Sequence, residues 1–573
     1  MNINIQLPFC DKLTGSELHN FLLMRPLMGD TLFGMGETNM KTQHLFLWLF
    51  IAIIGLAIAA TPVPAQDDCA TLAKQKLDNV TITSAVFIND PGGFMLPQTP
   101  GMFGTPPGLK TTAQFCRVTG FIEPVQNSHI GFEVWLPPVD KWNSRYFGVG
   151  NPAFEGAIKY QGLRKAVEEG YATASTDTGH QDPGHEWALG QPERLVDWTH
   201  RAVHETTVVA KSIIKAYYGK PQKYAYWDNC HNGGRQGLTE AQLYPDDFDG
   251  IVAGDPAFYL THLQAGSEYL SWLNLKDGIN SPSYIPPAKY PAIHRAVMNA
   301  CDALDGVKDN AIEDPTRCKF DPAAIQCTGE DNESCLTPAQ VETARRIYAG
   351  AKFNDGTQIY SGFEPGSELL WEAMIKGPEP LFINNGFFKY IAFEDPDWDF
   401  RTFNIDADTC KIDDRLGPVI NHTQTDLTAF KESGGKLILY QSWNETWVPP
   451  RTAVKYYKDV VNTMGGEDKT KDFFRLFVVP DCGMCPAMFP GTFDALGAVQ
   501  KWVEEGIAPD QITTTYFDQN AMFRERAGMQ DAPQSASKIN KRRPVCAYPE
   551  VAIYKGGGDM NDAANFKCGK PTW

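Results

Sequence analysis

The stretch Tyr224–Ala257, YAYWDNCHNGGRQGLTEAQLYPDDFDGIVAGDPA, decides the fold. An apolar run leads into a glycine-containing turn, a helical segment follows from about Gly234, and a second apolar run covers Gly250–Ala253. A strand, a helix and a strand in this order form a crossover between parallel strands of one sheet. We therefore predict an α/β protein with a doubly wound, mostly parallel sheet and with His231 at the tip of the turn.

The same stretch carries a family resemblance. From Cys230 to Ala257 the pattern CxxGGRQGLxEAQxxPxDFDGIVAGxPA resembles the central block of the tannase/feruloyl esterase family. The resemblance covers nearly everything after residue 66. It implies an α/β-hydrolase fold with a large inserted lid domain, secretion, and hydrolysis of carboxylic esters of phenolic acids. Five further segments match in the same order: ASTDTGHQ (174–181), WALGQPERLVDW (187–198), RAVHETT (201–207), CDALDGVKD (301–309) and GGKLILYQSW (434–443).

The amino-terminal region resembles a targeting segment. Residues 44–60 form an apolar run that follows Met40-Lys41 and precedes TPVPAQ. This arrangement is typical of a signal peptide, here over 40–65, and makes 1–39 an upstream extension from a mis-set start codon. The alternative is an uncleaved membrane anchor. Either interpretation places the rest of the chain outside the cytosol. In the signal-peptide interpretation the protein is secreted or periplasmic, with no membrane contact after signal cleavage.

The remaining chain divides into three parts. Residues 66–257 form the first part of the hydrolase core, 258–425 the lid with a calcium loop, and 426–573 the second part of the core. In the lid the regular alternation of strands and helices stops, and nine aromatic residues there are candidates for lid core or pocket lining. Within the core we predict strands at 130–136, 145–150, 436–440 and 474–480, and helices at 196–218 (with Val203, Val208, Ile213 and Ile214 buried), 451–461 and 492–505.

The charge of the chain argues against nucleic acid as a partner. The formal net charge is −18, and nucleic-acid binding needs basic clusters that this sequence lacks. By resemblance, the expected partner is a small aromatic or phenolic ester or acid.

Thirteen cysteines in a chain outside the cytosol indicate disulfides rather than free thiols. Cys410 and Cys482 could form one further pair beside those that the family resemblance implies. The resemblance implies Cys69–Cys116, Cys230–Cys485, Cys301–Cys318, Cys327–Cys335 and Cys546–Cys568.

An acidic loop in the lid predicts a structural Ca²⁺ site. Asp302, Asp305 and Asp309 follow one another at offsets of 0, 3 and 7 around a glycine turn. Carboxylates with backbone carbonyls between them suit Ca²⁺, and the resemblance implies these three side chains plus the carbonyls of Val307 and Ala311 as ligands. The alternative is a solvated acidic turn.

The catalytic positions depart from the family pattern. The resemblance implies a serine, an aspartate and a histidine where this chain has His231, Glu445 and Met484. A thioether cannot act as a general base, and no hydroxyl is left at the elbow. The oxyanion region is expected at Asn232, whose N–H follows the elbow tip, and in a loop where Pro152 and Ala153 replace a glycine-rich sequence.

Three interpretations follow from these changes. In the first, ordinary serine-esterase activity is weak or absent and the protein is a pseudoenzyme that binds a phenolic ligand. In the second, His231 and Glu445 form an acid–base dyad, or His231 attacks the ester as an imidazole nucleophile. In the third, His231, Cys482 and Met484 bind a soft metal such as copper.

Overall fold

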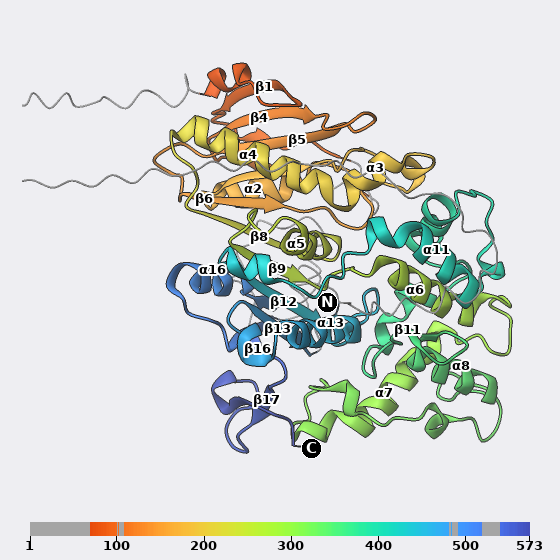
Figure 1. Cartoon of the computed structure of the whole chain (residues 1–573). Coiled ribbons are helices and arrows are strands. Elements are labelled where there is room, and N and C mark those ends of the chain that lie inside the picture. Colours follow the sequence, from red (N-terminus) through yellow and green to blue (C-terminus); the bar gives the residue numbers. More distant parts are fainter. Residues whose placement is uncertain are drawn as a thin grey trace, which may run out of the picture. The chain divides into compact units, whose positions relative to one another are not determined.

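A nine-stranded sheet organises the molecule (Figure 1). The computed structural model describes residues 69–99, 101, 108–480, 483, 491–517 and 539–572, which belong to one compact unit. The predicted upstream extension 1–39 and signal peptide 40–65, including the apolar run 44–60, lie outside the described residues, as do Cys482, Met484 and Cys485. No helix within the described ranges combines the length and apolarity that a membrane span requires.

The sheet is mostly parallel, as predicted. Its order is β1-β4-β5-β7-β6-β8-β9-β12-β13, and every pairing from β7 to β13 is parallel, whereas β1, β4 and β5 are antiparallel to their neighbours. The strands are β1 (Val80–Ile88), β4 (Phe115–Ile122), β5 (Ile130–Leu136), β6 (Arg145–Val149), β7 (Ala172–Thr176), β8 (Tyr224–Cys230), β9 (Gly250–Gly254), β12 (Lys436–Ser442) and β13 (Phe474–Val479).

Helices cover both faces of the sheet, which is the doubly wound arrangement. On one face α4 (Ala202–Tyr218), α5 (Asn232–Leu243) and α13 (Pro450–Thr463) pack against the strands in the largest hydrophobic core. On the other face α2 (Tyr160–Glu168) and α16 (Ala495–Glu505) pack against Tyr226, Val252 and Ile438. The central strands are buried on both sides, and this explains why they are continuous apolar runs in the sequence.

Two predicted elements differ in the structure. The helix predicted over 196–218 is α3 (Pro192–Val196), a π-helical segment (Asp197–Arg201) and α4. Val208 was predicted to be buried but is 43% exposed, because it lies five residues after Val203 and is rotated about 140° from that buried position. The helix predicted from residue 492 begins at Ala495, where the Asp494 carboxylate accepts from the Gly497 N–H, and Gly491–Phe493 form β14.

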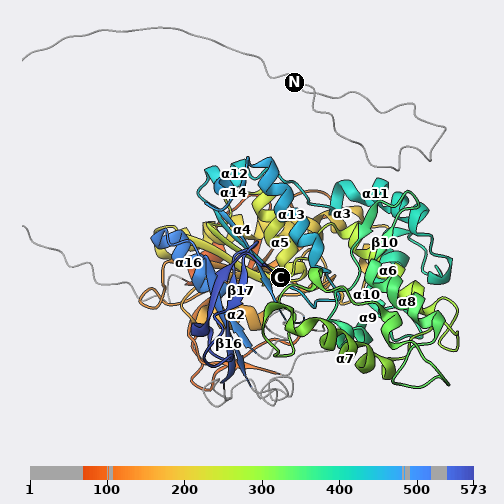
Figure 2. The ribbon, with the colours of Figure 1, turned by 90° about the horizontal axis from the view of Figure 1, so that it is seen from below.

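Residues 258–425 are the predicted lid, and none of the described strands in this range joins the nine-stranded sheet. Figures 1 and 2 both show its helices gathered to one side of the sheet. A bidentate ion pair fastens the lid to the core, since Arg451 of α13 donates at 2.5 and 2.7 Å to the buried Glu364. The main lid elements are α6 (Leu260–Leu275), α7 (Tyr290–Cys301), α8 (Pro338–Ala349), α9 (Glu372–Ile375), α10 (Phe382–Gly386), α11 (Ile405–Ile420) and the hairpin β10 (Ala351–Lys352) and β11 (Gln358–Tyr360).

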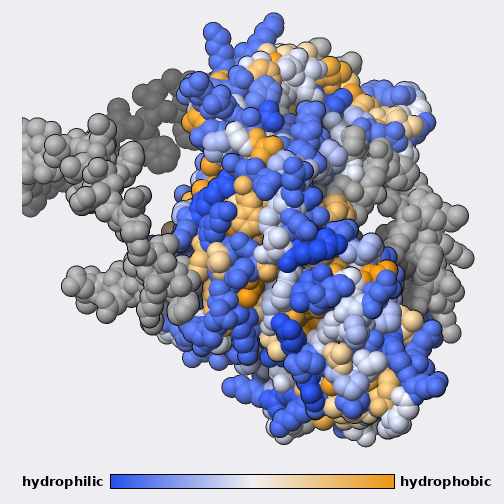
Figure 3. Space-filling model, turned by 90° about the vertical axis from the view of Figure 1, so that its right-hand side faces the viewer, coloured by the Kyte–Doolittle hydropathy of each residue, from blue (hydrophilic) through white to orange (hydrophobic). Residues whose placement is uncertain are grey.

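The carboxy-terminal region adds two small sheets. β15 (Gln511–Phe517) pairs with β14 and β16 (Ile539–Cys546), and β17 (Val551–Tyr554) pairs with β18 (Phe566–Gly569). On the face drawn in Figure 3, hydrophobic residues form small patches among hydrophilic ones.

Four predicted disulfides are confirmed: Cys69–Cys116, Cys301–Cys318, Cys327–Cys335 and Cys546–Cys568. Cys230 and Cys410 are also disulfide-bonded. Their predicted partners, Cys485 and Cys482, lie outside the described residues, and these two pairings stay predictions.

Candidate active site

The tip of the elbow between β8 and α5 is His231, which has φ of 57° and ψ of −117°. Residues other than glycine rarely adopt this combination of φ and ψ, and backbone strain of this kind clusters at functional sites. The His231 N–H donates to the Gly254 carbonyl at 2.9 Å, and the His231 carbonyl accepts from the N–H groups of Arg235 and Ala257. Gly234 permits this packing, because a Cβ there would lie 2.3 Å from the Gly254 oxygen.

His231 faces the buried carboxylate of Glu445. Their Nε2 and Oε2 atoms are 3.7 Å apart, and the side chains are 17% and 1% exposed. The other Glu445 oxygen, Oε1, accepts from the Trp447 N–H at 2.6 Å. Neither Nε2 nor Oε2 has a hydrogen-bond partner among the described residues. A small rotation of the imidazole would therefore form a direct hydrogen bond within a pair that has no competing partners.

The loop that carries Glu445 follows β12, and two hydrogen bonds fix the residues that precede Glu445. The Ser442 N–H donates to the Asp255 carboxylate at 2.7 Å, and the Asn444 side-chain oxygen accepts from the Gly483 N–H at 2.7 Å. Gly483 immediately precedes Met484, so the acid loop touches the segment in which the family's base is expected. Met484 itself lies outside the described residues, and its predicted place in the site stays a prediction.

The predicted oxyanion residues Asn232, Pro152 and Ala153 line the same cavity as His231. Asn232 is the first residue of α5, where the backbone N–H has no acceptor within the helix. In the facing loop the Asn151 N–H already donates to Gln236 Oε1 at 3.0 Å, and Pro152 has no N–H. Ala153 has a positive φ of 44°, a backbone conformation that glycine adopts more readily than alanine. The N–H groups of Asn232 and Ala153 are therefore the candidate oxyanion donors.

A cavity of about 300 Å³ opens between the elbow and the lid. Its core side carries the aromatic rings of Phe154, Trp198 and Trp447 beside His231. Its lid side is formed by α6, α9 and α10 and the turn before α10, with mainly aliphatic side chains: Leu260, Leu263, Met374, Leu381 and Ile383. The volume lies at the small end of ligand pockets and suits one aromatic ring with a short ester arm.

Sequence reasoning missed the lid lining. Three lid residues in the cavity wall are polar, namely Gln264, Ser267 and Asn384. None of the nine candidate lid aromatics lines the cavity. Several of them, including Trp371, Phe387 and Phe388, are fully buried within the lid. The sequence alone did not separate the residues that line the cavity from the lid aromatics that do not. Both kinds occur on the same helix, since α6 carries Gln264 in the cavity wall as well as Tyr269 and Trp272 outside it. The nine aromatics were Tyr259, Tyr269, Trp272, Trp371, Phe387, Phe388, Tyr390, Phe393 and Trp398.

The acids of the predicted calcium loop have hydrogen-bond and ion-pair partners within the protein, and calcium binding stays a prediction. Asp302 accepts from the Asp309 and Asn310 N–H groups, both at 3.2 Å, and Asp305 accepts from the Val307 N–H. Burial and the neighbouring acids raise the pKa of Asp305 to about 6. Asp309 bonds Arg543 at 2.6 Å and Lys541 at 3.2 Å. An excess of negative charge thus surrounds Asp305, whereas Asp309 is already neutralised by two cations of β16.

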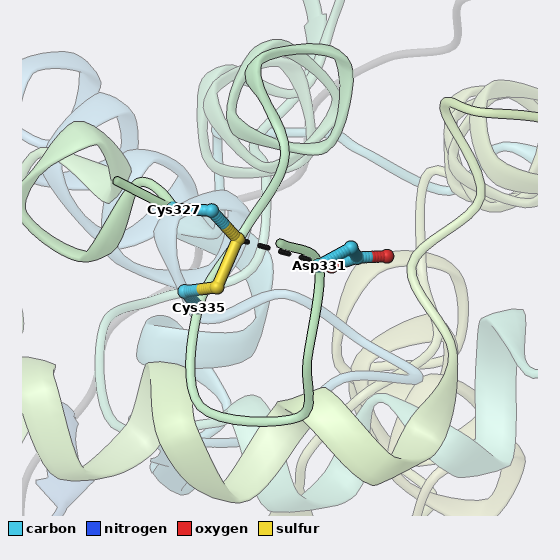
Figure 4. A group of neighbouring side chains, drawn as sticks. All are labelled: Cys327, Asp331 and Cys335. Carbon is cyan, nitrogen blue, oxygen red and sulfur yellow. Dashed lines mark hydrogen bonds between the residues drawn. A yellow bond between two sulfur atoms is a disulfide. The ribbon is translucent and has the colours of Figure 1, made fainter. Parts of the chain in front are cut away.

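Two other groups of potential metal ligands occur among the described residues. In the first, Cys327 and Cys335 are joined by a disulfide beside Asp331 (Figure 4), which leaves no thiolate for a metal. In the second, His204 bonds Asp247 at 2.6 Å. There, burial and the Asp247 carboxylate raise the pKa of Glu240. The copper hypothesis needs Cys482 and Met484, which lie outside the described residues.

Comparison with known proteins identifies relatives of this site. The profile of the family "Tannase and feruloyl esterase" matches residues 116–569. An uncharacterized esterase of Xanthomonas campestris pv. campestris is 34% identical over 90% of this chain and 93% of its own length. A probable feruloyl esterase B-1 of Aspergillus fumigatus is 30% identical over 91% of this chain and 100% of its own length.

Solved structures agree with the fold. Feruloyl esterase B from Aspergillus oryzae superposes with a TM-score of 0.79 at 27% identity, over 88% of this chain and 100% of that one. Tannin acyl hydrolase from Aspergillus niger gives a TM-score of 0.69 at 20% identity, over 89% of this chain and 96% of that one. The second likeness shows the fold alone.

Proposed function

Because the chain belongs to the tannase and feruloyl esterase family, we propose that it binds a carboxylic ester of a phenolic or similar aromatic acid in the cavity beside His231. We further propose that it hydrolyses this ester through a His231–Glu445 dyad instead of a serine triad. The observation that carries this proposal is the imidazole at the strained elbow tip, 3.7 Å from a buried carboxylate that has no other partner on that oxygen.

The ordinary serine route lacks its chemistry here. An acyl-enzyme route of that type needs a hydroxyl nucleophile and a base that takes its proton. This chain has an imidazole at the nucleophile position and Met484 at the base position. We therefore expect serine-esterase activity to be weak or absent.

The dyad can activate water directly. With Nε2 held by Glu445, the lone pair of His231 Nδ1 accepts a proton from a water molecule while the water oxygen bonds to the ester carbonyl carbon. The oxyanion that forms is stabilised by the Asn232 N–H at the helix start. When the carbon–oxygen ester bond breaks, the imidazolium returns the proton to the leaving alkoxide. The products are an acid and an alcohol, and Glu445 stabilises the imidazolium throughout.

A second candidate is binding without turnover. It is favoured by the oxyanion loop, where the Asn151 N–H is occupied by Gln236 and Pro152 has none. Losing one oxyanion donor typically costs about 10²- to 10³-fold in rate. In this case the cavity would hold its ligand and release it unchanged.

A reversion experiment tests the assignment of the positions. The triple variant His231→Ser, Glu445→Asp, Met484→His should gain hydrolysis of methyl ferulate and p-nitrophenyl acetate, whereas His231→Ser alone should not, because triad members act as a unit. Restoring glycine at Pro152 and Ala153 extends the test to the oxyanion loop. A triple variant that folds, binds methyl ferulate and stays inactive even with the two glycines would contradict the assignment.

We also propose that the protein is secreted through a signal peptide over 40–65 and that its lid loop binds Ca²⁺. Disulfides in the described residues support a location outside the cytosol. Three carboxylates around one glycine turn support a cation at the loop, because oxygen ligands of this kind suit Ca²⁺. Asp302, Asp305 and Asp309 with the Val307 and Ala311 carbonyls would hold the ion. Its role would be to fix the lid, because the loop contributes no residue to the cavity wall.

A further inference from the structure

Two amide side chains in the lid wall of the cavity each have a buried polar atom with no hydrogen-bond partner among the described residues. Gln264 on α6 and Asn384 on α10 are 5% and 3% exposed, and both line the cavity. Gln264 Oε1 and Asn384 Nδ2 are buried and unpaired. One is a hydrogen-bond acceptor and the other a donor.

Unpaired buried amides need an explanation, because most buried polar atoms in native proteins are satisfied and leaving one unsatisfied costs stability. Leu260 and Leu263 lie beside Gln264 on α6, and Ile383 precedes Asn384, so an aliphatic residue would suit both positions. The usual reason for a few polar groups in an otherwise apolar cavity is to orient a ligand.

We propose that Gln264 and Asn384 determine specificity by binding a hydroxyl group on the aromatic ring of the substrate. A phenolic hydroxyl donates one hydrogen bond and accepts another, which matches Gln264 Oε1 and Asn384 Nδ2 together. The aliphatic side chains of Leu263, Met374 and Ile383 provide the apolar walls for the ring, and the ester group then points to His231. This inference rests on the proposed function, because it places the ester end of the ligand at the elbow.

The charge of the lining narrows the ligand class further. None of the described residues that line the cavity is Asp, Glu, Lys or Arg, and His231 is the titratable side chain among them, because Cys230 is disulfide-bonded. A ring with a second carboxylate would be buried without a counter-charge, which is strongly unfavourable. The site therefore selects a neutral, hydroxylated ring over a carboxylated or an unsubstituted one.

A matched pair of ligands tests the proposal by binding alone. Methyl 4-hydroxycinnamate and methyl cinnamate differ in one hydroxyl, and their dissociation constants are measured by calorimetry with full-length protein. The His231→Ala background removes dyad turnover. We expect the hydroxylated ester to bind at least about tenfold more tightly, because an ester without the hydroxyl leaves both amides unpaired. Gln264→Met and Asn384→Leu should each bring this ratio close to one. The control variant Phe382→Met, at an exposed position of α10 outside the cavity wall, should keep the ratio.

Each outcome has a defined meaning. If neither ester binds, the proposed function and this inference both fail. If both esters bind equally well, the cavity binds aromatic esters but the amides do not read a hydroxyl. If the ratio persists in Gln264→Met and Asn384→Leu, other residues read it and the inference is overturned.

The ligand-free variants provide a second readout. Because the amides have no partner to lose, Gln264→Met should unfold at the same or a higher temperature than the parent protein. A clear loss of thermal stability would mean that the amide makes structural hydrogen bonds, and that result would also contradict the proposal.

Discussion

A histidine at the elbow tip changes the chemical groups that the turn can offer to a substrate. A serine hydroxyl at this place needs a separate base, whereas an imidazole is itself a base and can also be a nucleophile. Asp-to-Glu at position 445 adds one methylene, and the longer side chain reaches the imidazole from the acid loop. In the proposed function, the two substitutions together form an acid–base pair that does not need a base at position 484.

A second buried acid gives a prediction at the residue scale. Glu268 on α6 is fully buried, neither of its oxygens has a partner among the described residues, and burial raises its pKa to about 8. The pKa of Glu268 in the folded protein lies above its value in the unfolded chain. The folded protein is therefore most stable at low pH, where Glu268 is protonated, and it loses stability as the pH rises towards 8.

The variant Glu268→Gln should therefore be more stable than the wild type at pH 9, by an amount on the order of 2 kcal/mol, and similar to it at pH 5. Thermal unfolding of both proteins at the two pH values measures this difference. The exposed Glu372→Gln on α9 is the control and should show no such pH dependence. An equal difference at both pH values would mean that Glu268 is ionised in the folded protein.

Single residues show how far sequence reasoning could reach. It placed His231 at the tip and Glu445 at the acid position, and the structure brings these two side chains together. It could not find Gln264 or Asn384, because an unpaired buried amide is recognised only from its surroundings. It also placed Val208 in the core, although Val208 is exposed. An apolar residue type alone does not show which face of the helix the side chain occupies.

At the scale of elements, strong apolar runs were reliable predictors. The crossover β8–α5–β9 follows the predicted order, and α5 begins at Asn232, two residues before the predicted start. The π-helical turn at Asp197–Arg201 was not predictable, because a segment of five residues is too short to reveal a change in the apolar period. The short strand β14 was hidden for a similar reason, since its three residues adjoin the helix that follows.

The calcium loop gives a prediction at this scale. If Ca²⁺ binds, chelation by EDTA should lower the unfolding temperature, because a ligand at 100 times its dissociation constant stabilises the folded state by about 2.7 kcal/mol. Asp305→Asn should abolish the effect of EDTA. Elemental analysis of the dialysed protein gives the bound calcium directly.

The alternative is that Arg543 and Lys541 neutralise the loop instead of an ion. In that case EDTA leaves the melting curve unchanged, no calcium is found, and Arg543→Met is strongly destabilising because Asp309 loses a buried partner. The exposed Arg345→Met, which removes a surface ion pair with Asp321, is the control and should have little effect.

At the scale of the whole molecule, the fold could be predicted but the cavity could not. The parallel sheet follows from local patterns, whereas the cavity wall combines residues from Pro152 to Val448 that only the assembled core and lid bring together. Figures 1 and 2 show the lid helices beside the sheet, and the Arg451–Glu364 ion pair joins the two parts. The family assignment explains the shared architecture, and the elbow residues determine what chemistry that architecture can perform.

The most direct test of the dyad is the hydrolysis of methyl ferulate by the purified protein and its variants, followed by chromatography of the released ferulate. The account predicts slow hydrolysis that increases with pH as an imidazole loses its proton. The rate should fall by roughly 10²-fold or more in His231→Ala and also fall in Glu445→Gln. The control His129→Ala removes an exposed imidazole and should leave the rate unchanged. Hydrolysis that survives His231→Ala at the wild-type rate would contradict the dyad as the catalytic group.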